Sequence, residues 1–260
     1  MKNNNIKLVS LNAWCGRALY PLMSFFRNYQ DKIDIFCLQE IVNSDQKISD
    51  ERHPEEHICG PLFEKISKEL KDFEGSFAYF DDDPNRMSLA VFIRRTLPVK
   101  NIEDLVIYRP AKPKEIGSIM FTARKLQYVT LDINGQDLII ANYHGLWNGG
   151  PKADVPERIE QSNKIKSFLN TKSGQKILCG DFNLLPDTES MAILEKGMRN
   201  LVKEYKVNST RTSLYRHDHD KDVPKFADYI LATQDVNIRE FKVLPDVVSD
   251  HAPLYLEFSV

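Results

Sequence analysis

The chain has 260 residues, of which 42% are hydrophobic and 28% charged, with 11 Gly and 13 Pro; this composition predicts a globular protein that can bury a large core. The formal net charge of −2 argues against a protein whose main role is to coat nucleic acid, although it is compatible with a local basic groove. No linker-like run, low-complexity segment or internal repeat divides the sequence, so residues 1–260 are expected to form one domain.

None of the four cysteines shows CxxC spacing. Cys37 and Cys179 stand inside apolar runs, as small core residues do, which indicates reduced thiols and a cytoplasmic protein. The first residues, MKNNNIKLVSLNAWCG, lack the apolar length and the cleavage site of a signal peptide. No apolar stretch is long enough to cross a membrane, so stable membrane association is not expected.

The first part of the chain alternates short apolar strands with amphipathic helices. Strands are predicted over 6–11 (IKLVSL), 33–38 (IDIFCL) and 89–93 (LAVFI), and helices over 19–29 and 61–70. The polar stretches between them are expected to be solvated loops. They include the acidic triplet 81–83 and a segment with His53, His57 and Cys59. These three residues could be zinc ligands, but the polar, irregular composition around them favours a solvated loop.

The second part opens with a hairpin. Strands 126–133 and 137–143 meet across Asn134-Gly135, a strong two-residue turn signal. Further strands are predicted at 177–179, 226–232, 236–244 and 254–258, and helices at 155–169 and 187–197. The stretch 198–225 is expected to be irregular.

One stretch concentrates the chemistry, KILCGDFNLLPD at 176–187. Its apolar strand ends at Gly180, where the backbone is expected to turn or to approach another segment closely. Asp181 and Asn183 follow two residues apart, so in an extended segment both side chains point to one side and can hold a water and a hard cation. The alternative is an Asx turn that merely closes the strand.

Polar side chains occur at the ends of the other predicted strands as well. The set is Asn12, Glu40, His144, Asp250 and His251, and Asp228 lies inside the predicted strand 226–232. A carboxylate beside or inside a buried run, as Asp228 is, is costly unless it is paired, solvated or bound to a cation. If the strands form one packed scaffold, the polar ends share a mouth, and so oxygen-rich a set suits Mg²⁺ or Mn²⁺ better than a closed zinc site. A histidine such as His144, taken alone, is more often a hydrogen-bonded structural residue.

The motifs SLNAW, FCLQE, NYHGLW, LCGDFNLLPD, FADYIL and SDHAPL resemble, in that order, those of the endonuclease/exonuclease/phosphatase superfamily, whose fold is shared with deoxyribonuclease I. The resemblance extends from Leu8 nearly to the C-terminus. It implies an α/β fold, a four-layered α/β sandwich in which two mixed β-sheets pack face to face and are flanked by helices. No GxSxG, Walker or GxGxxG motif supports a serine hydrolase, a nucleotide triphosphatase or a Rossmann enzyme.

The resemblance also implies roles for the polar set. Glu40 is the principal metal ligand, and Asn12 and Asp250 complete or support the shell of the Mg²⁺ or Mn²⁺ ion. Asp181 orients or deprotonates the attacking water, with Asn183 as its partner.

On the phosphate, His251 hydrogen-bonds the oxygens while Asp228 orients its imidazole, and His144 is the second phosphate-facing histidine. Water then displaces the leaving oxygen in line.

Contacts to the substrate are expected from loops around the mouth. The candidates are Arg17, Trp147, Asn148 and Lys152, because Arg and Lys pair with phosphate and a rim Trp can stack on a base or cover a lipid or sugar face. Core packing is the alternative for Trp147. Arg158, inside a helix, is expected to be structural or solvated.

The expected substrate is a phosphoester, first a phosphodiester in a nucleic acid or nucleotide-like molecule. The alternative is a phosphomonoester or a phospholipid-type diester such as an inositol phosphate or a sphingomyelin-like lipid, and a catalytically inactive binding module is a remote third choice. The text NAWCGR and LQEIVNS departs from the NxNGxR motif and the following lysine of abasic-site nucleases. The oligomeric state has no signal in the sequence.

Overall fold

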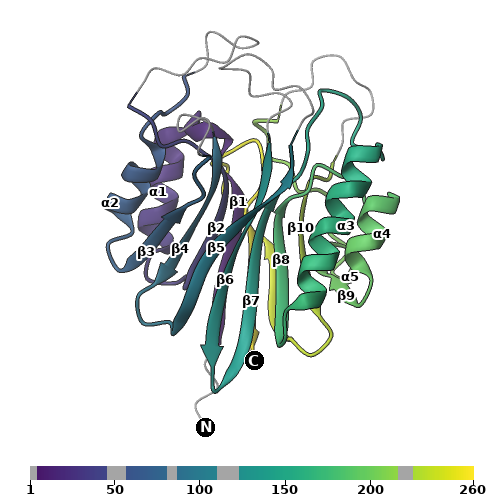
Figure 1. Ribbon diagram of the computed structural model, residues 1–260. Coiled ribbons are helices and arrows are strands. Elements are labelled where there is room, and N and C mark those ends of the chain that lie inside the picture. The colour runs from purple at the N-terminus through teal and green to yellow at the C-terminus, as the bar shows by residue number, and fades with distance from the viewer. Residues whose placement is uncertain (1–4, 46–56, 81–86, 110–122, 216–224) are drawn as a thin grey trace.

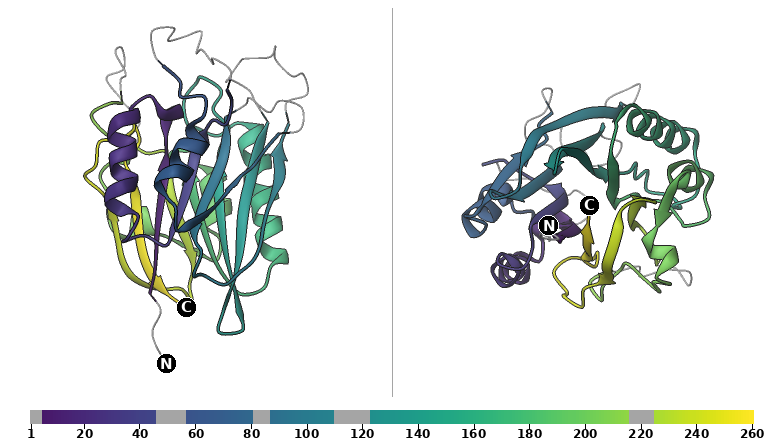
Figure 2. Two further views of the ribbon diagram at one scale, coloured as in Figure 1. Left: turned by 90° about the vertical axis from the view of Figure 1, so that its left-hand side faces the viewer. Right: turned by 90° about the horizontal axis from the view of Figure 1, so that it is seen from below.

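The structure, a computed structural model, describes residues 5–45, 57–80, 87–109, 123–215 and 225–260. His53 and the acidic triplet 81–83, both assigned to loops above, lie outside these residues. The described chain forms two six-stranded mixed sheets that pack face to face, with helices on the outer faces (Figures 1 and 2). The predicted α/β sandwich is therefore confirmed.

Sheet A has the strand order β11-β12-β1-β2-β4-β3. Its strands are β1 Ile6–Asn12, β2 Ile35–Ile41, β3 Phe73–Phe77, β4 Ser88–Arg94, β11 Asn237–Val243 and β12 Leu254–Ser259. Sheet B has the order β5-β6-β7-β8-β10-β9. Its strands are β5 Val99–Tyr108, β6 Arg124–Ile133, β7 Gln136–His144, β8 Gln175–Asp181, β9 Met198–Asn200 and β10 Asp228–Thr233.

The two sheets share one pattern of strand directions. In each, a single parallel pair, β1 with β2 or β7 with β8, is flanked on both sides by antiparallel strands. Parallel neighbours end at the same edge of a sheet. The four central strands β1, β2, β7 and β8 therefore all terminate at the same end of the sandwich. This end lies opposite the one where both chain termini are found (Figure 1).

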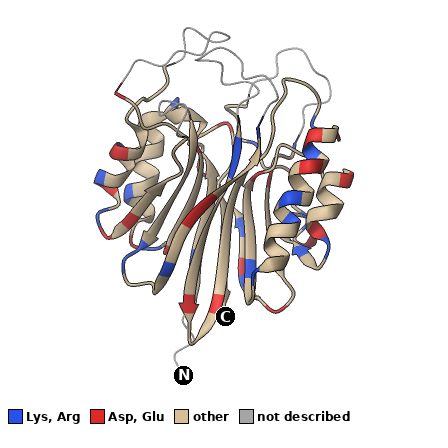
Figure 3. Cartoon of the chain, viewed as in Figure 1, with Lys and Arg blue, Asp and Glu red and all other residues tan. Residues whose placement is uncertain are grey.

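Helices cover each sheet on its outer face. α1 Leu19–Tyr29 and α2 Leu62–Glu69 pack Phe26 and Ile66 against β2 on sheet A. α3 Pro156–Thr171 and α4 Glu189–Glu195 cover sheet B, and the short helices are η1 Trp14–Gly16 and α5 Leu201–Glu204 (Figure 1). Charged residues gather on the outer helices and on strand ends (Figure 3). Within the described residues, no helix has both the length and the apolar character that a membrane crossing needs.

Most predicted elements are present, and the exceptions have simple causes. β3 and β5 were missed because both are edge strands whose residues are mostly exposed or half-buried, and β5 includes Glu103 and Asp104. β9 and α5 lie in the stretch that was expected to be irregular. The sequence placed Asp228 inside a strand. In the structure β10 begins at Asp228, so this carboxylate lies at a strand end.

A pair of buried amides joins the two sheets just beneath the converging strand ends. Gln39 Nε2 of β2 donates to Asn142 Oδ1 of β7 at 2.7 Å. Asn142 Nδ2 in turn donates to the carbonyl oxygens of Leu38 (3.0 Å) and Ala90 (3.2 Å) in sheet A. Buried amides must find such partners, so this clamp fixes how the sheets slide and rotate against each other.

Gly180 is required by the close approach of β7 and β8. Its φ is +139°, and a Cβ atom there would lie 1.9 Å from the carbonyl oxygen of Tyr143. The expected close backbone approach at Gly180 is thereby confirmed, and it sets the spacing of the strands that carry His144 and Asp181.

Replacing Gly180 by Ala should lower the free energy of unfolding by about 3 kcal/mol, because the backbone conformation and the contact with Tyr143 are both incompatible with a side chain. Urea unfolding measures this. Gly150→Ala is the matched control, since its nearest neighbour would be Asn148 Oδ1 at 3.5 Å, and its effect should stay within about 0.5 kcal/mol. Equal stability of the two variants would contradict the steric account.

Candidate functional site

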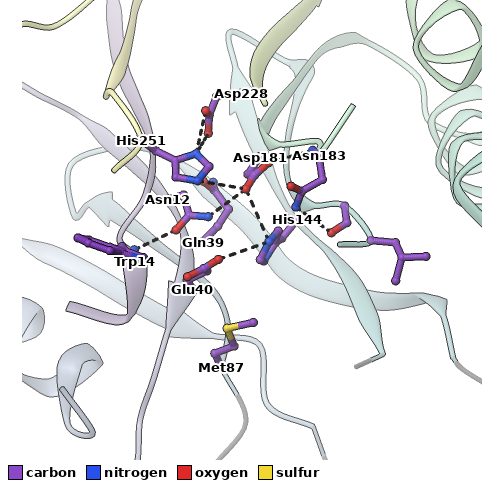
Figure 4. A network of polar contacts seen from close by, with 12 residues as sticks. Asn12, Trp14, Gln39, Glu40, Met87, His144, Asp181, Asn183, Asp228 and His251 are labelled. Atoms are coloured by element: carbon purple, nitrogen blue, oxygen red, sulfur yellow. Dashed lines mark hydrogen bonds and ion pairs between the residues drawn. The ribbon is translucent and has the colours of Figure 1, made fainter. Parts of the chain in front are cut away.

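The polar strand ends meet at one end of the sandwich. β1 and β2 of sheet A bring Asn12 and Glu40, and β7 and β8 of sheet B bring His144 and Asp181, which are direct neighbours in the parallel register. Asp228 pairs with Asp181 across the antiparallel neighbour β10, and His251 precedes β12. Figure 4 shows these side chains pointing toward one another.

Asp181 lies at the centre of the cluster and is 2% exposed. Its Oδ2 accepts a hydrogen bond from Asn12 Nδ2 at 3.0 Å and lies 3.7 Å from His144 Nε2 and 3.6 Å from His251 Nε2. Burial alone would raise the pKa of Asp181, but His251, Lys152 and further cationic groups hold it well below its usual range. Asp181 is therefore ionised at neutral pH.

Asn183 does not extend the strand. β8 ends at Asp181, Asn183 has a φ of +52°, and its backbone N–H donates to Asp181 Oδ1 at 2.9 Å. This is the Asx turn that the sequence left open as an alternative, so the expected extended geometry is wrong. The turn leaves Oδ2 of Asp181 facing the cluster, while the Asn183 side chain accepts a hydrogen bond from Lys152 Nζ at 2.7 Å.

Glu40 reaches the site through a distortion of β2. The register with β4 shifts between Leu38 and Ile41, and Glu40 has a φ of +53°. Such a bulge redirects a side chain that strict alternation would turn toward the α1 and α2 layer, where Leu38 and Ile41 lie. Oε1 of Glu40 lies 3.8 Å from His144 Nε2, and the Cys15 thiol donates to Oε2 at 3.6 Å.

The two histidines have opposite electrostatic environments. Burial and the charge of Arg124 lower the pKa of His144 to about 4, against the opposing effect of Asp181 and Glu40. Burial and Arg211 also act to lower the pKa of His251, but the carboxylates of Asp228, Asp250 and Asp181 raise it above its ordinary value. His144 is thus neutral at pH 7, whereas His251 is the imidazole that more readily carries a proton.

Asp228 orients His251. Both of its carboxylate oxygens lie 2.8 Å from His251 Nδ1, which donates to them. The backbone N–H of His251 is held by Ser249 Oγ at 3.1 Å. Nε2 is consequently the nitrogen that faces Asp181 and the rest of the cluster (Figure 4).

Arg211 was not anticipated from the sequence. It belongs to the stretch that was expected to be irregular, yet its backbone forms a β-bridge with His251. Its Nη1 contacts His251 Nε2 and lies 3.4 Å from Asp250 Oδ2. Asp250, expected as a metal ligand, is thus drawn toward Arg211 and His251. No motif marks this arginine, since only the fold aligns its segment with the last strand.

The donor set fits a divalent cation. Glu40, His144 and Asp181 each offer a ligand atom, and these atoms lie within 4.8 Å of one another. Two carboxylate oxygens and a neutral imidazole are suitable ligands for Mg²⁺ or Mn²⁺. Asn12 lies beside this group, but its Oδ1 accepts the backbone N–H of Trp14 at 2.9 Å. Asp181, Asp228 and His251 form a second such group.

The candidate substrate residues occupy two different loops. Arg17 is half-buried, with its guanidinium 5.5 Å from the ring centre of Trp14. Trp147 and Asn148 are half-buried in the loop after β7, and Asn148 Oδ1 accepts hydrogen bonds from Arg158 Nη2 (3.2 Å) and Gly150 N (3.1 Å). The Asn148 carboxamide oxygen therefore stabilises the conformation of this loop.

Arg158 is structural, as expected, and it is 1% exposed. From α3 it donates to the carbonyl oxygens of Leu146 (3.2 Å) and Pro151 (2.7 Å) and to that of Ala153. The loop after β7 is thereby tied to α3 along its length. This anchoring holds Lys152, which is itself buried, against Asn183.

Backbone strain is concentrated at the site. Of the six described non-glycine residues with positive φ, four border it, namely Trp14, Cys15, Glu40 and Asn183. Such conformations are costly and persist where the surrounding structure enforces them, which is common at functional sites.

The sequence matches the profile of the Endonuclease/Exonuclease/phosphatase family over residues 9–251. No curated protein matches it. Among solved structures, it is similar to an endonuclease/exonuclease/phosphatase family protein from Bacteroides thetaiotaomicron, with 16% identity over 99% of this chain and 98% of the other and a TM-score of 0.73.

Two further similar structures are of proteins with a named activity or a bound ligand. A mannosyl-6-phosphatase from Bacteroides thetaiotaomicron shares 18% identity over 98% of this chain and 100% of the other, with a TM-score of 0.69. D. rerio TDP2, complexed with a single-strand DNA product, shares 15% identity over 99% of this chain and 100% of the other, with a TM-score of 0.71. At these identities the likeness shows the fold alone.

The histidine environments predict two separate titrations. In metal-free protein, ¹H-¹³C NMR should find His144 titrating near 4 and His251 above 6.5. Since unfolded His144 binds protons more readily than folded His144, its contribution to stability is complete above pH 6.5 and is lost as the pH falls toward 4. His144→Gln and His251→Gln assign the signals, and a His144 that titrates at or above His251 would refute the assignment.

Proposed function

Because this chain belongs to the endonuclease/exonuclease/phosphatase family, we propose that it hydrolyses phosphoesters with the help of a divalent cation, by in-line attack of water on phosphorus. The observation that carries the proposal is the environment of Asp181. A buried, ionised carboxylate lies between two histidines and beside Glu40, from strand ends of both sheets.

Asp181 is the group that holds the attacking water. Asn183 N–H and Asn12 Nδ2 fix its two oxygens in place. Because its pKa is so low, Asp181 is a weak base, so we assign it to orienting the water and receiving its proton only as the new bond to phosphorus forms. Asn183 acts through its backbone on this orientation.

His251 acts on the phosphate. Asp228 holds its Nδ1, and Nε2 has Arg211 Nη1, which can only donate, as its neighbour. When His251 is protonated, Nε2 donates a hydrogen bond to a phosphate oxygen as negative charge develops there, in place of the contact with Arg211. His144, neutral at pH 7, lies on the Glu40 side of Asp181 and is available as a metal ligand or as a hydrogen-bond partner of the phosphate.

Glu40, with His144 and Asp181, would hold the cation, Mg²⁺ or Mn²⁺, because both ions accept carboxylate oxygens as ligands. Once bound, the ion supplies Lewis-acid polarisation of a phosphate oxygen. We retain Asn12 and Asp250 as outer partners of this group.

The free cysteines of the described chain support the proposed cytoplasmic location.

The test is product release from a panel of phosphoesters, with Mg²⁺, with Mn²⁺ and with chelator. The panel contains single- and double-stranded DNA, RNA, a sugar phosphate, an inositol phosphate, a sphingomyelin-type lipid and the chromogenic mono- and bis(p-nitrophenyl) phosphates. Metal-dependent cleavage of any class supports the proposal. A panel that stays uncleaved would favour the inactive binding module.

Asp181→Asn should lower kcat by about a thousandfold, since it removes the group that orients the water. His251→Ala should lower kcat by about a hundredfold or more through loss of a donor to the developing charge. Steady-state kinetics on the cleaved substrate measure both. The matched control is Asp235→Asn, in an exposed turn, which should retain wild-type turnover. Near wild-type rates in both site variants would remove the assignment.

Glu40→Gln should act first on metal affinity. A carboxamide lacks the negative charge that a hard cation needs, so the Mg²⁺ concentration for half-maximal activity should rise about tenfold or more. Calorimetric titration with Mg²⁺ gives the same comparison without turnover. An unchanged metal-binding curve would exclude Glu40 as a ligand.

A further inference from the structure

Two buried cations lie beside the catalytic cluster, next to Asn183 and His251. Lys152 comes from the loop after β7, and Arg211 comes from the segment that pairs with His251. Lys152 is 5% exposed, and the Arg211 side chain is 7% exposed. Lysine and arginine are rarely buried to this degree unless they have anionic partners.

Arg211 is held in one orientation. Its backbone N–H donates to Ser209 Oγ at 3.0 Å, and its guanidinium carbon lies 4.0 Å from the ring centre of Tyr215. The guanidinium therefore makes a cation–π contact with Tyr215, which restricts its position. Nη1 faces His251 Nε2, so a phosphate oxygen that approaches this imidazole also meets Arg211.

The donors of Arg211 are not all used within the described chain. Nη1 has Asp250 and His251 as neighbours, but the buried Nε has no hydrogen-bond partner there. A buried N–H without an acceptor is costly, and its presence beside a phosphate-facing histidine points to an acceptor that arrives with the substrate.

Lys152 is fixed in a similar way. Its Nζ donates one hydrogen bond to Asn183 Oδ1, and its backbone oxygen accepts the N–H of Leu185 at 2.9 Å. Among the described residues, two of its three N–H bonds are left for other acceptors. The charges of Arg211 and Lys152 also interact, since burial and then Arg211 lower the pKa of Lys152 to about 8.

The number of cations beside the site determines how much negative charge a substrate phosphate can carry there. A phosphodiester has two unesterified oxygens and one negative charge, which the cation proposed at Glu40, His144 and Asp181 would balance together with His251. A phosphomonoester has a third unesterified oxygen and a second charge near neutral pH. Arg211 and Lys152 supply a cationic side for that third oxygen.

We propose that Arg211 and Lys152 form an anion subsite that receives the third oxygen of a phosphomonoester, so that the substrate is a terminal phosphate group. The inference rests on the proposed phosphoester hydrolysis and reverses the order of the two substrate classes expected from the sequence. Both side chains are substrate-binding groups in this arrangement, and neither exchanges a proton.

Binding of inorganic phosphate tests the subsite without turnover. In calorimetric titrations of the Mg²⁺-loaded protein, wild type should bind phosphate saturably, and Arg211→Gln and Lys152→Met should each bind it about tenfold or more weakly, because each loses a charge-assisted hydrogen bond. Dimethyl phosphate, which has one charge and two free oxygens, should bind wild type at least about tenfold more weakly, with little further loss in the variants.

Three controls isolate the effect. Arg27→Gln and Lys164→Met change exposed residues of α1 and α3 and should bind phosphate as wild type does. Arg211→Lys keeps the charge but loses the fork, so its affinity should fall between those of wild type and Arg211→Gln. Urea unfolding without phosphate identifies any variant that has lost its fold.

The proposal is overturned if folded Arg211→Gln and Lys152→Met bind phosphate like wild type, if wild type shows no saturable binding, or if dimethyl phosphate binds as tightly as phosphate. Kinetics separate it from the proposed function. The preference for p-nitrophenyl phosphate over its bis ester should fall about tenfold in the variants. If neither ester is cleaved, hydrolysis fails as the function while the binding comparison still decides the subsite.

Discussion

The site depends on the amide clamp that joins the two sheets. Gln39 and Asn142 are each adjacent or nearly adjacent to a site residue, Glu40 on one sheet and His144 on the other. Because these side chains project from different sheets, their separation of 3.8 Å is set by how the sheets pack and not by either strand alone. A buried amide pair with several satisfied hydrogen bonds resists sliding in a way that apolar contacts, which lack direction, do not.

Above the clamp, the chain departs from regular geometry to aim its functional groups. Strand alternation would turn Glu40 toward the helices, and the bulge in β2 returns it to the site. β8 ends at Asp181 in a turn. Its Oδ1 accepts the backbone N–H of Asn183, and its Oδ2 faces the cluster, where it accepts a hydrogen bond from Asn12. The regular part of the sandwich fixes the position of the site, and its irregular part fixes the direction of the side chains.

The sequence predicted the scaffold well because strands with apolar runs and helices with a three- and four-residue period are local patterns. Asn12, Glu40, His144, Asp181 and His251 stood at predicted strand ends and Asp228 inside a predicted strand. The fold brings these six residues together, and the resemblance predicted a role for each of them. The turn at Asn183 and the place of Arg211 could not be predicted. The first depends on a single backbone torsion angle, and the second on a pairing between segments far apart in the chain. β5 was hidden because an edge strand need not be apolar.

The strand order also determines when the site can form. Sheet A is completed only when β12, near the C-terminal end, pairs with β1, near the N-terminal end, and the loop before β12 carries His251. Pairing over so large a sequence separation is slow, because the entropy of closing the loop must be overcome before the contacts form. During synthesis, sheet B can assemble from strands that are consecutive or nearly so, and β1, β2, β3 and β4 of sheet A can pair with one another before β12 is made. His251, in contrast, takes its place only when β12 has emerged and paired with β1. A growing chain can therefore bring most of its site residues together while it still lacks the histidine that Asp228 orients.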